Sequence, residues 1–359
     1  MCNPKEDSIY MMRCMELARL GMPYAKPNPM VGSVLVHQGK IISEGWHQYY
    51  GGPHAEINCL NKLAEKDRSV LSESTLYVNL EPCAHHGKTP PCAQRIVEEK
   101  IQRVVIANKD PFAKVQGKGI ELMRQAGIEV VENMASDAGL WLNRRFLCMH
   151  QQQRPYIILK WAQTHSGFFA TTDRKRLQIS NAASQRLVHK WRMEESAIMV
   201  GTDTALYDNP SLTVRYWDGP QPLKIILDRY LRLPQTLSVF QSDTPVWVVN
   251  VQKEAQEGNI HYIQVPEENL LPQLMKRLYA ADVMSLFVEG GSTLLQRFIE
   301  EKLWDEARVL YAPHNMDKGI AAPQLLDAQM FMETILSNNM LRCYMPNRTA
   351  YPYVPGMEL

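Results

Sequence analysis

Residues 75–97, TLYVNLEPCAHHGKTPPCAQRIV, place a predicted strand, a loop and a predicted helix in immediate succession. The apolar run 75–80 is typical of a strand, and a helix is expected to begin near Cys92. The loop between them carries Cys83, two adjacent histidines, a lysine and three prolines. Such a loop could be a disulfide loop, a small structural zinc site or part of an active site.

The segments around this loop predict a layered α/β domain. A helix is expected over residues 8–20, and apolar runs on both sides of a Gln38-Gly39 turn signal predict a hairpin over 31–47. A helix from His54, a strand at 103–107, a helix at 119–126 and a short strand at 128–131 complete the alternation.

The second half of the chain restarts the same alternation. The polar stretch FLCMHQQQRP, residues 146–155, is typical of a boundary rather than a core element. Strands follow at YIILKWA, AIMVG, LKIILD, PVWVVN, SLFVEG and EARVLY, with a helix over SQRLVHKWRMEE. A chain of 359 residues favours two domains. We therefore predict domains at 1–148 and 149–359, and a C-terminal segment too rich in Pro and Tyr to assign.

Composition argues against several classes of protein. The formal net charge of +1 gives no electrostatic basis for a nucleic-acid binder. We find neither a signal-peptide pattern nor about 18 uninterrupted apolar residues, so we expect no membrane role and a cytoplasmic location. Seven unevenly spaced cysteines make a disulfide framework a poor expectation and leave reduced thiols as candidate metal ligands.

His54, Cys83 and Cys92 can supply the three protein ligands of a catalytic Zn²⁺ site, which leaves a fourth position for water. Bound zinc can lower the pKa of water to about 7. Glu56, two residues after His54, can then take a proton from the water and return it to a departing amine. The H-x-E plus P-C…C pattern is typical of zinc deaminases, although their usual second half is P-C-x-x-C.

The eight residues between the two cysteines, AHHGKTPP, are the departure from that pattern. They supply His85, His86 and Lys88, which could hold a phosphate on a small substrate. His85 or His86 could instead be the fourth ligand of a structural zinc site. Cys59 is a further possible ligand, but on the helix after Glu56 it is better explained as a buried apolar group.

Four stretches of the first half, KPNPMVGSVLV, GGPHAE, LEPCAHHGKTPPC and NKDPFAKVQGKG, resemble the deaminase domain of the bifunctional deaminase/reductase family of riboflavin biosynthesis. The resemblance implies a cytidine-deaminase-like α/β/α fold and zinc-dependent removal of an amino group from a phosphorylated diaminopyrimidine. It also implies substrate-contact positions at Asn28, His47, His85, Lys88 and Asp110. Asn-Pro and Asp-Pro are also ordinary turn formers, so Asn28 and Asp110 could be turn residues.

In the second half, AIMVGTDTALYDNPSLTVR and FVEGGSTLLQ are similar to the reductase domain of the same family. The resemblance implies a dihydrofolate-reductase-like fold, an NADPH cofactor, a homo-oligomer and a catalytic Lys160, which could also be a strand-end surface lysine. Glycines at a strand-to-helix turn suit a phosphate, but a glycine pair before a helix is most often just a tight turn. The implied cofactor positions are Gln163, Gln178, Thr204, Asp208, Gly291, Ser292 and Thr293. The implied substrate positions are Arg176, Arg192, Leu212, Arg215 and Glu289, of which Arg215 could instead be a solvated surface residue.

Two departures from the family pattern stand out. The family commonly has Ser-Leu-Asp-Gly where this chain has THSG at 164–167, and Gln178 replaces an aromatic residue. The basic run 174–176 could offer charge to the 2′-phosphate of NADPH, although such runs are usually just solvated.

We therefore predict an enzyme that deaminates a small phosphorylated pyrimidine and then reduces its ribosyl chain. Two alternatives stay open: a deaminase that acts on nucleic acid, and a second domain that only binds nucleotide.

Overall fold

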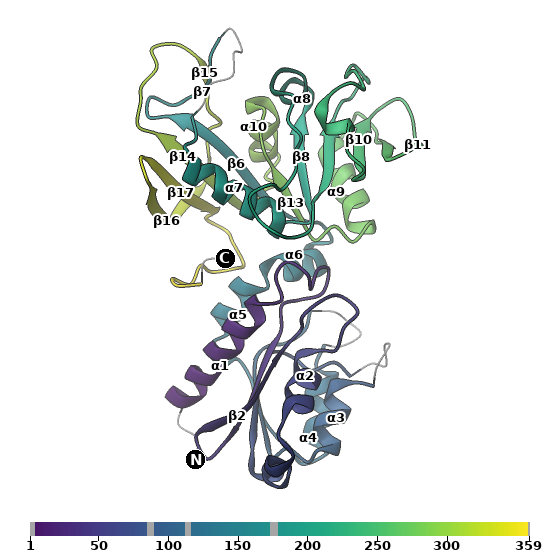
Figure 1. Cartoon of the computed structure of the whole chain (residues 1–359), viewed down its shortest axis with the longest axis vertical. Coiled ribbons are helices and arrows are strands. Elements are labelled where there is room, and N and C mark those ends of the chain that lie inside the picture. The colour runs from purple at the N-terminus through teal and green to yellow at the C-terminus, as the bar shows by residue number, and fades with distance from the viewer. Residues whose placement is uncertain (1–3, 85–89, 112–115, 173–178, 358–359) are drawn as a thin grey trace. The chain divides into compact units, whose positions relative to one another are not determined.

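The chain divides into two compact units, which are described separately. The computed structural model describes residues 4–84, 90–111, 116–172 and 179–357 (Figure 1). The first unit comprises Met1–Gln152 with Ala350–Leu359, and the second comprises Gln153–Thr349. The boundary expected after residue 148 therefore lies after Gln152, and the last ten residues group with the first unit. In the described part of the chain, no helix is both long and apolar enough to cross a membrane.

Within its described residues, the first unit has five strands in one sheet, ordered β2-β1-β3-β4-β5. β1 pairs with β2 and with β3, antiparallel to both, and β4 pairs with β3 and with β5, parallel to both. The strands are β1 (Gly32–His37), β2 (Lys40–Trp46), β3 (Thr75–Leu80), β4 (Arg103–Asn108) and β5 (Glu129–Val131). The helices are α1 (Pro4–Arg19), α2 (Ala55–Lys62), the 3-10 helix η1 (Glu65–Glu73), α3 (Cys92–Glu98), α4 (Lys118–Gln125), α5 (Ser136–Leu142) and α6 (Arg144–Gln152).

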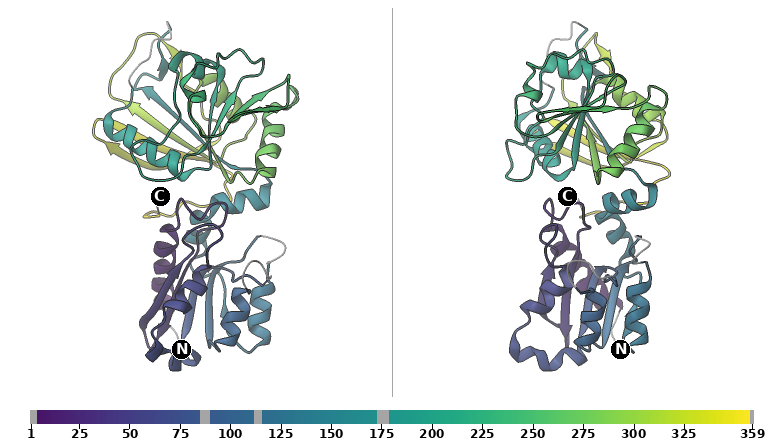
Figure 2. Two further views of the ribbon diagram at one scale, coloured as in Figure 1. Left: turned by 45° about the vertical axis from the view of Figure 1, so that its right-hand side comes forward. Right: turned by 90° about the vertical axis from the view of Figure 1, so that its right-hand side faces the viewer.

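The sheet lies between two layers of helices, and successive side chains along each strand point to opposite faces. Leu35, Leu76 and Val104 pack with the apolar faces of α2, α3 and α4 in one core. Helices α1 and α5 cover the other face of the sheet (Figures 1 and 2). The predicted α/β/α fold is confirmed, and so is the hairpin, whose turn places Gln38 and Gly39 at positive φ.

The segment expected to be a non-core boundary is instead largely helical. Residues 144–152 form α6, and Phe146, Leu147 and Cys148 on it are buried. Only the glutamines at its end are exposed. The division between the units does fall inside the stretch 146–155, after Gln152. The expectation that the stretch is not a core element was wrong, because the polar end of the helix masked the apolar residues that precede it.

The C-terminal segment is packed against helices of the first unit. The Trp141 indole N–H donates to the Met357 carbonyl at 3.1 Å, and its ring lies edge-on to Tyr353. Tyr351 is buried, and its hydroxyl donates to Gln151 at 3.2 Å. These tyrosines, which made the segment hard to assign from sequence, are the residues that hold it in place.

In the described part of the second unit, ten strands form one mixed sheet, ordered β11-β12-β10-β9-β8-β13-β6-β14-β17-β16, and β7 pairs with β15. The strands from β12 to β14 in this order run parallel. The strands are β6 (Tyr156–Thr164), β7 (Phe168–Ala170), β8 (Ala197–Gly201), β9 (Leu223–Leu227), β10 (Val246–Asn250), β11 (Ala255–Glu257), β12 (Ile260–Gln264), β13 (Ser285–Val288), β14 (Glu306–Ala312), β15 (Ile320–Ala321), β16 (Ala328–Leu336) and β17 (Asn339–Pro346).

Helices cover both faces of this sheet. They are α7 (Ala182–Glu194), α8 (Thr202–Asp208), the 3-10 helix η2 (Ser238–Phe240), α9 (Leu270–Ala280) and α10 (Ser292–Glu300). Residues of α9 and α10 share a core with alternate side chains of the parallel strands. On the opposite face, Trp191 of α7 packs against Phe287 of β13. The predicted second α/β domain is therefore confirmed.

Candidate active sites

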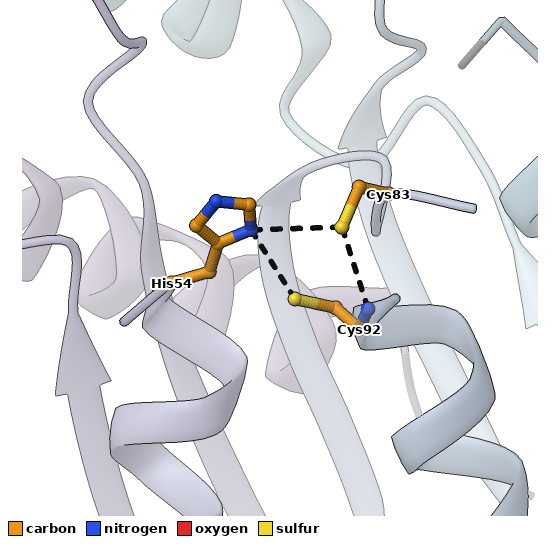
Figure 3. Close-up of side chains that lie close together, drawn as sticks. All are labelled: His54, Cys83 and Cys92. Carbon is orange, nitrogen blue, oxygen red and sulfur yellow. Dashed lines mark hydrogen bonds between the residues drawn. The ribbon is translucent and has the colours of Figure 1, made fainter. Parts of the chain in front are cut away.

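Three segments of the first unit converge at the predicted metal site. His54 immediately precedes α2, Cys83 follows β3, and Cys92 is the first residue of α3 (Figure 3). Their ligand atoms all lie within 4.8 Å of one another. Residues that are far apart in sequence meet because two helix starts lie beside the carboxyl end of a central strand.

The spacing of these atoms fits a tetrahedral metal. His54 Nδ1 lies 3.6 Å from Cys83 Sγ and 3.3 Å from Cys92 Sγ. Zinc bonds of about 2.0 Å to nitrogen and 2.3 Å to sulfur, at a tetrahedral angle, would put such atoms about 3.5 Å apart. One imidazole nitrogen and two sulfurs are also a donor set that zinc prefers. The residues present therefore fit zinc.

The local hydrogen bonds already favour a thiolate. The Cys92 backbone N–H donates to Cys83 Sγ at 3.3 Å. Hydrogen bonds from the Cys92 side chain and from His54 lower the pKa of Cys83 to about 4, against the effect of burial. The hydrogen bond to Cys83 in turn raises the pKa of His54 to about 9. A metal that binds here must displace the proton from His54.

Glu56 lies beside the ligands but is not among them in the described cluster. It is 3% exposed and belongs to the first turn of α2, two residues after His54. Burial raises the pKa of Glu56 to about 7, although the charge of His54 opposes that shift. A carboxyl group with this pKa can both accept and donate a proton near neutral pH.

His47 and Asn28 are joined next to the metal ligands. The Asn28 side-chain amide lies 3.0 Å from His47 Nε2, and His47 Nδ1 lies 3.0 Å from the Pro53 carbonyl. Because the carbonyl can only accept and the amide N–H donates, the proton of His47 is on Nδ1. Burial also lowers the pKa of His47, and its ring lies edge-on to His54 at 5.5 Å. Both residues named from the sequence are thus adjacent to the cluster.

Glu81 supports the end of β3 and does not belong to the described ligand cluster. Its carboxylate accepts backbone N–H groups of Asp110, Gly117 and Gly119 at 3.0–3.3 Å. At Gly119 a Cβ atom would lie 2.0 Å from the Pro82 carbonyl oxygen, so only glycine fits there. These contacts fix the backbone directly before Cys83. Asp110 is buried among them.

Several residues named from the sequence lie outside the described residues. They are His85, His86, Lys88, Arg174, Lys175, Arg176 and Gln178. The phosphate contacts and the coenzyme preference expected of them therefore stay predictions.

A second candidate site is a cavity of about 1250 Å³ in the second unit. It opens where the parallel strands β6, β8, β9 and β13 end, which is where α/β sheets usually bind ligands. Ten of the residues predicted from the sequence line it: Lys160, Arg192, Thr204, Asp208, Leu212, Arg215, Glu289, Gly291, Ser292 and Thr293.

Charged side chains from three elements meet in this cavity. Arg192 of α7 donates to both carboxylate oxygens of Glu289, at 2.7 and 2.8 Å. Burial alone would raise the pKa of Glu289, but Arg192 and Lys160 hold it below its ordinary value. Burial lowers the pKa of Lys160, with Glu289 opposing. Lys160 therefore holds its proton less tightly than an exposed lysine does.

The glycine pair after β13 leaves backbone exposed to the same cavity. Gly290 and Gly291 have φ of 114° and 73°, and α10 begins at Ser292. A Cβ atom on Gly291 would lie 3.3 Å from the Thr204 hydroxyl, so Thr204 closes over this turn. Small residues and a helix start suit a nucleotide phosphate.

Gln163 is not part of the cavity lining. Its side chain accepts the Trp161 indole N–H at 2.7 Å. The altered segment 164–167 forms the turn after β6, in which Thr164 Oγ1 accepts the Phe168 N–H and Ser166 bonds both ways with Met316. Ser166 thus stands where the family has the acidic residue, and its hydroxyl links the turn to the main chain of Met316.

Other polar residues of the cavity escaped the sequence analysis, among them His189, Arg229 and Arg232. His189 lies one helical turn before Arg192 on α7, which could have indicated a shared face. The two arginines follow β9, and nothing local distinguishes them from surface arginines.

Comparisons with known proteins cover both units. The family model described as the cytidine and deoxycytidylate deaminase zinc-binding region matches residues 4–108. The RibD C-terminal domain matches residues 155–335. The two matches correspond to the two candidate sites.

Relatives extend over nearly the whole chain. The riboflavin biosynthesis protein RibD of Aquifex aeolicus is 38% identical over 89% of this chain and 90% of its own length. That of Escherichia coli is 33% identical over 86% and 88%. A solved diaminohydroxyphosphoribosylaminopyrimidine deaminase/5-amino-6-(5-phosphoribosylamino)uracil reductase from Thermotoga maritima is 32% identical, with a TM-score of 0.89 over 96% of this chain and 99% of its own. The chain thus belongs to the RibD family of bifunctional riboflavin-biosynthesis enzymes.

Proposed function

We propose that Glu56 and the His54, Cys83 and Cys92 cluster carry out hydrolytic deamination, and that the cavity of the second unit carries out the reduction. The chain is a deaminase and a reductase of riboflavin biosynthesis, with zinc and NADPH as cofactors. The observation that carries the first proposal is the convergence of three N/S ligands beside a buried carboxyl group.

The substrate proposed for the first unit is the diaminohydroxyphosphoribosylaminopyrimidine named for the Thermotoga maritima relative. When bound, zinc acts as a Lewis acid that makes water a stronger acid. Glu56 accepts a proton as the water oxygen adds to the amino-bearing ring carbon, and it returns the proton to the nitrogen that leaves as ammonia. Asn28 and His47 are proposed to orient the ring from beside the ligands.

The second unit is proposed to reduce the deaminated product, whose ribosyl group becomes ribityl. NADPH supplies a hydride for the C1′ carbon when it is bound. Lys160 donates a proton to the ring oxygen of the sugar as the ring opens, which its lowered pKa favours. The turn at 290–293 binds a cofactor phosphate.

Arg192 and Glu289 are proposed to bind the sugar hydroxyls, and Arg215 to bind the 5′-phosphate. A guanidinium can hold phosphate with two parallel hydrogen bonds. Supporting this proposal, all three residues line the cavity.

The deaminase proposal is tested by Glu56→Gln. Because this variant keeps the ligands, we expect one zinc per chain, as measured by metal analysis, and a deamination rate lower by about 10²–10⁴-fold. The exposed Glu121→Gln on α4 is the matched control and should be fully active. A fully active Glu56→Gln enzyme would remove Glu56 from the mechanism.

The reductase proposal is tested by NADPH oxidation with two substrates. We expect turnover with the deaminated product and none with the diaminopyrimidine when deamination is blocked in Glu56→Gln. A second unit that only binds nucleotide would oxidise no NADPH in either case. Activity on transfer RNA but not on the diaminopyrimidine nucleotide would instead favour a nucleic-acid deaminase.

A homo-oligomer and a cytoplasmic location are further proposals; family resemblance supports the first, and the sequence composition supports the second. Light scattering after size exclusion and cell fractionation test them. A monomer, or a membrane-associated chain, would contradict them.

A further inference from the structure

The segment 211–215, which follows α8 and has no regular secondary structure, is held in place by side chains from elsewhere in the second unit. The Arg192 guanidinium donates to the Thr213 carbonyl at 3.2 Å. Gln221 bonds to both the N–H and the carbonyl of Val214, at 2.7 and 3.1 Å. The Arg215 N–H donates to His189 Nδ1 at 3.1 Å. Three consecutive residues are therefore each fixed by a polar side chain.

The contact with Arg215 defines the state of the His189 imidazole. A backbone N–H can only donate, so Nδ1 carries no proton and the neutral ring carries its proton on Nε2. His189 is 4% exposed, and the centroid of its ring lies 4.5 Å from that of the Tyr216 ring. Burial, and then the charges of Arg192 and Arg215, lower the pKa of His189 to about 4, against the opposing charge of Glu289. The acceptor at Nδ1 is thus maintained at neutral pH.

The side chain of Arg215 is held toward its own segment. Its Nη1 donates to the Ser211 hydroxyl at 2.7 Å and lies 3.4 Å from the Thr213 hydroxyl. Arg215 is exposed and lines the cavity. Because the side chain is bonded to residues of its own segment, the place of the guanidinium in the cavity depends on where the Arg215 main chain is held.

We propose that His189 is a positioning residue for the reductase substrate. Its Nδ1 holds the Arg215 main chain, and this sets where the Arg215 guanidinium meets the 5′-phosphate. The inference rests on the proposed phosphate-binding role of Arg215. It assigns His189 no contact with the reacting atoms.

Two substitutions distinguish the roles of the two ring nitrogens of His189. The Asn side-chain oxygen is two bonds from Cβ, as Nδ1 is, so His189→Asn can keep the acceptor for the Arg215 N–H. The Gln amide is three bonds from Cβ, as Nε2 is, so His189→Gln keeps a donor there and loses the acceptor. The pair therefore tests which nitrogen matters.

The experiment measures NADPH oxidation by the full chain with the deaminated product, with and without its 5′-phosphate. Loss of one hydrogen bond of about 1.4 kcal/mol corresponds to about tenfold in KM. We expect His189→Gln to raise KM about tenfold for the phosphorylated substrate, with kcat nearly unchanged. We expect little effect without the phosphate. His189→Asn should stay close to the unsubstituted enzyme.

A double variant tests whether His189 acts through Arg215. His189→Gln combined with Arg215→Ala should be no worse than Arg215→Ala alone, because residues that act through one another are not additive. Thermal unfolding and the deaminase rate of each preparation control for folding and concentration.

Four outcomes would overturn the inference while leaving the proposed function intact. These are a raised KM in His189→Asn with normal His189→Gln, additive effects in the double variant, equal effects on both substrates, and an unchanged KM in His189→Gln. If His189→Gln does not fold, a folded His189→Asn with a tenfold higher KM still overturns it. An Arg215→Ala enzyme with unchanged KM would instead remove the proposed role of Arg215 and this inference with it.

Discussion

Replacing Glu289 by Gln should destabilise the second unit, because it leaves a buried arginine without its counter-ion. The side chains of Arg192 and Glu289 are 12% and 9% exposed and joined by two hydrogen bonds. Breaking a buried pair costs about 3–5 kcal/mol. Because the pair borders an open cavity, we expect the low end, about 3 kcal/mol. The positive charge of Lys160 adds to the penalty, since Glu289 offsets it as well.

The assay is urea unfolding followed by hydrogen exchange of α7 and β13. A chain of two units need not unfold in one step, so a local probe is required. The matched control is Glu333→Gln, which removes the partner of Arg342 in a pair that is 36% and 42% exposed. Surface pairs contribute about 0–1 kcal/mol. A cost for Glu289→Gln no greater than for Glu333→Gln would refute the reasoning.

The same variant has a pH signature. The folded-state pKa of Glu289 lies below its ordinary value, so its contribution is present above the unfolded pKa of about 4.3. It is lost as the pH falls through the folded pKa. The stability difference between the enzyme and Glu289→Gln should therefore shrink below about pH 4.3. A difference that persists at lower pH would show that lost packing, not charge, causes the effect.

Three further predictions concern the metal and the cofactor. Gly119→Ala should displace the Pro82 main chain beside Cys83 and lower zinc affinity at least about tenfold in chelator competition, as loss of a supporting contact does. Gly127→Ala adds a methyl group in open space and should leave the affinity unchanged. Zinc affinity should fall as the pH drops below about 9, the pKa of His54, because metal and proton compete for this residue; an affinity that stays constant below that pH would exclude the competition. Gly291→Ala should raise the KM for NADPH through strain at positive φ and crowding of the turn, whereas Gly258→Ala, also at positive φ but in open space, should leave it unchanged.

Local signals made the metal site readable from the sequence. His54 and Cys92 lie at helix starts and Cys83 at a strand end, and each of these positions follows from neighbouring residues. The pattern of chemistry and spacing then left few alternatives. The strands of the first unit were equally readable, because apolar runs and turn residues act over a few positions. In the second unit the same signals predicted β6, β8, β9, β10, β13 and β14 but missed β7, β11, β12, β15, β16 and β17.

Other features depended on contacts between distant segments. The α6 helix was missed because glutamines at its end outweighed the apolar residues before them, and the C-terminal tail because its partner, Trp141, is more than two hundred residues away.

The sequence by itself predicted the two α/β domains and the three candidate metal ligands, since element periodicity and ligand type are local properties, and its motifs indicated the family by resemblance. Tertiary structure alone decided which polar groups share one environment. The contact of Arg192 with Glu289 joins residues 97 positions apart, and that of His189 with Arg215 joins residues 26 apart. The Arg215 N–H there selects one proton position on His189, and burial lowers the pKa of both His189 and Lys160, an effect that arises only when the folded chain excludes water.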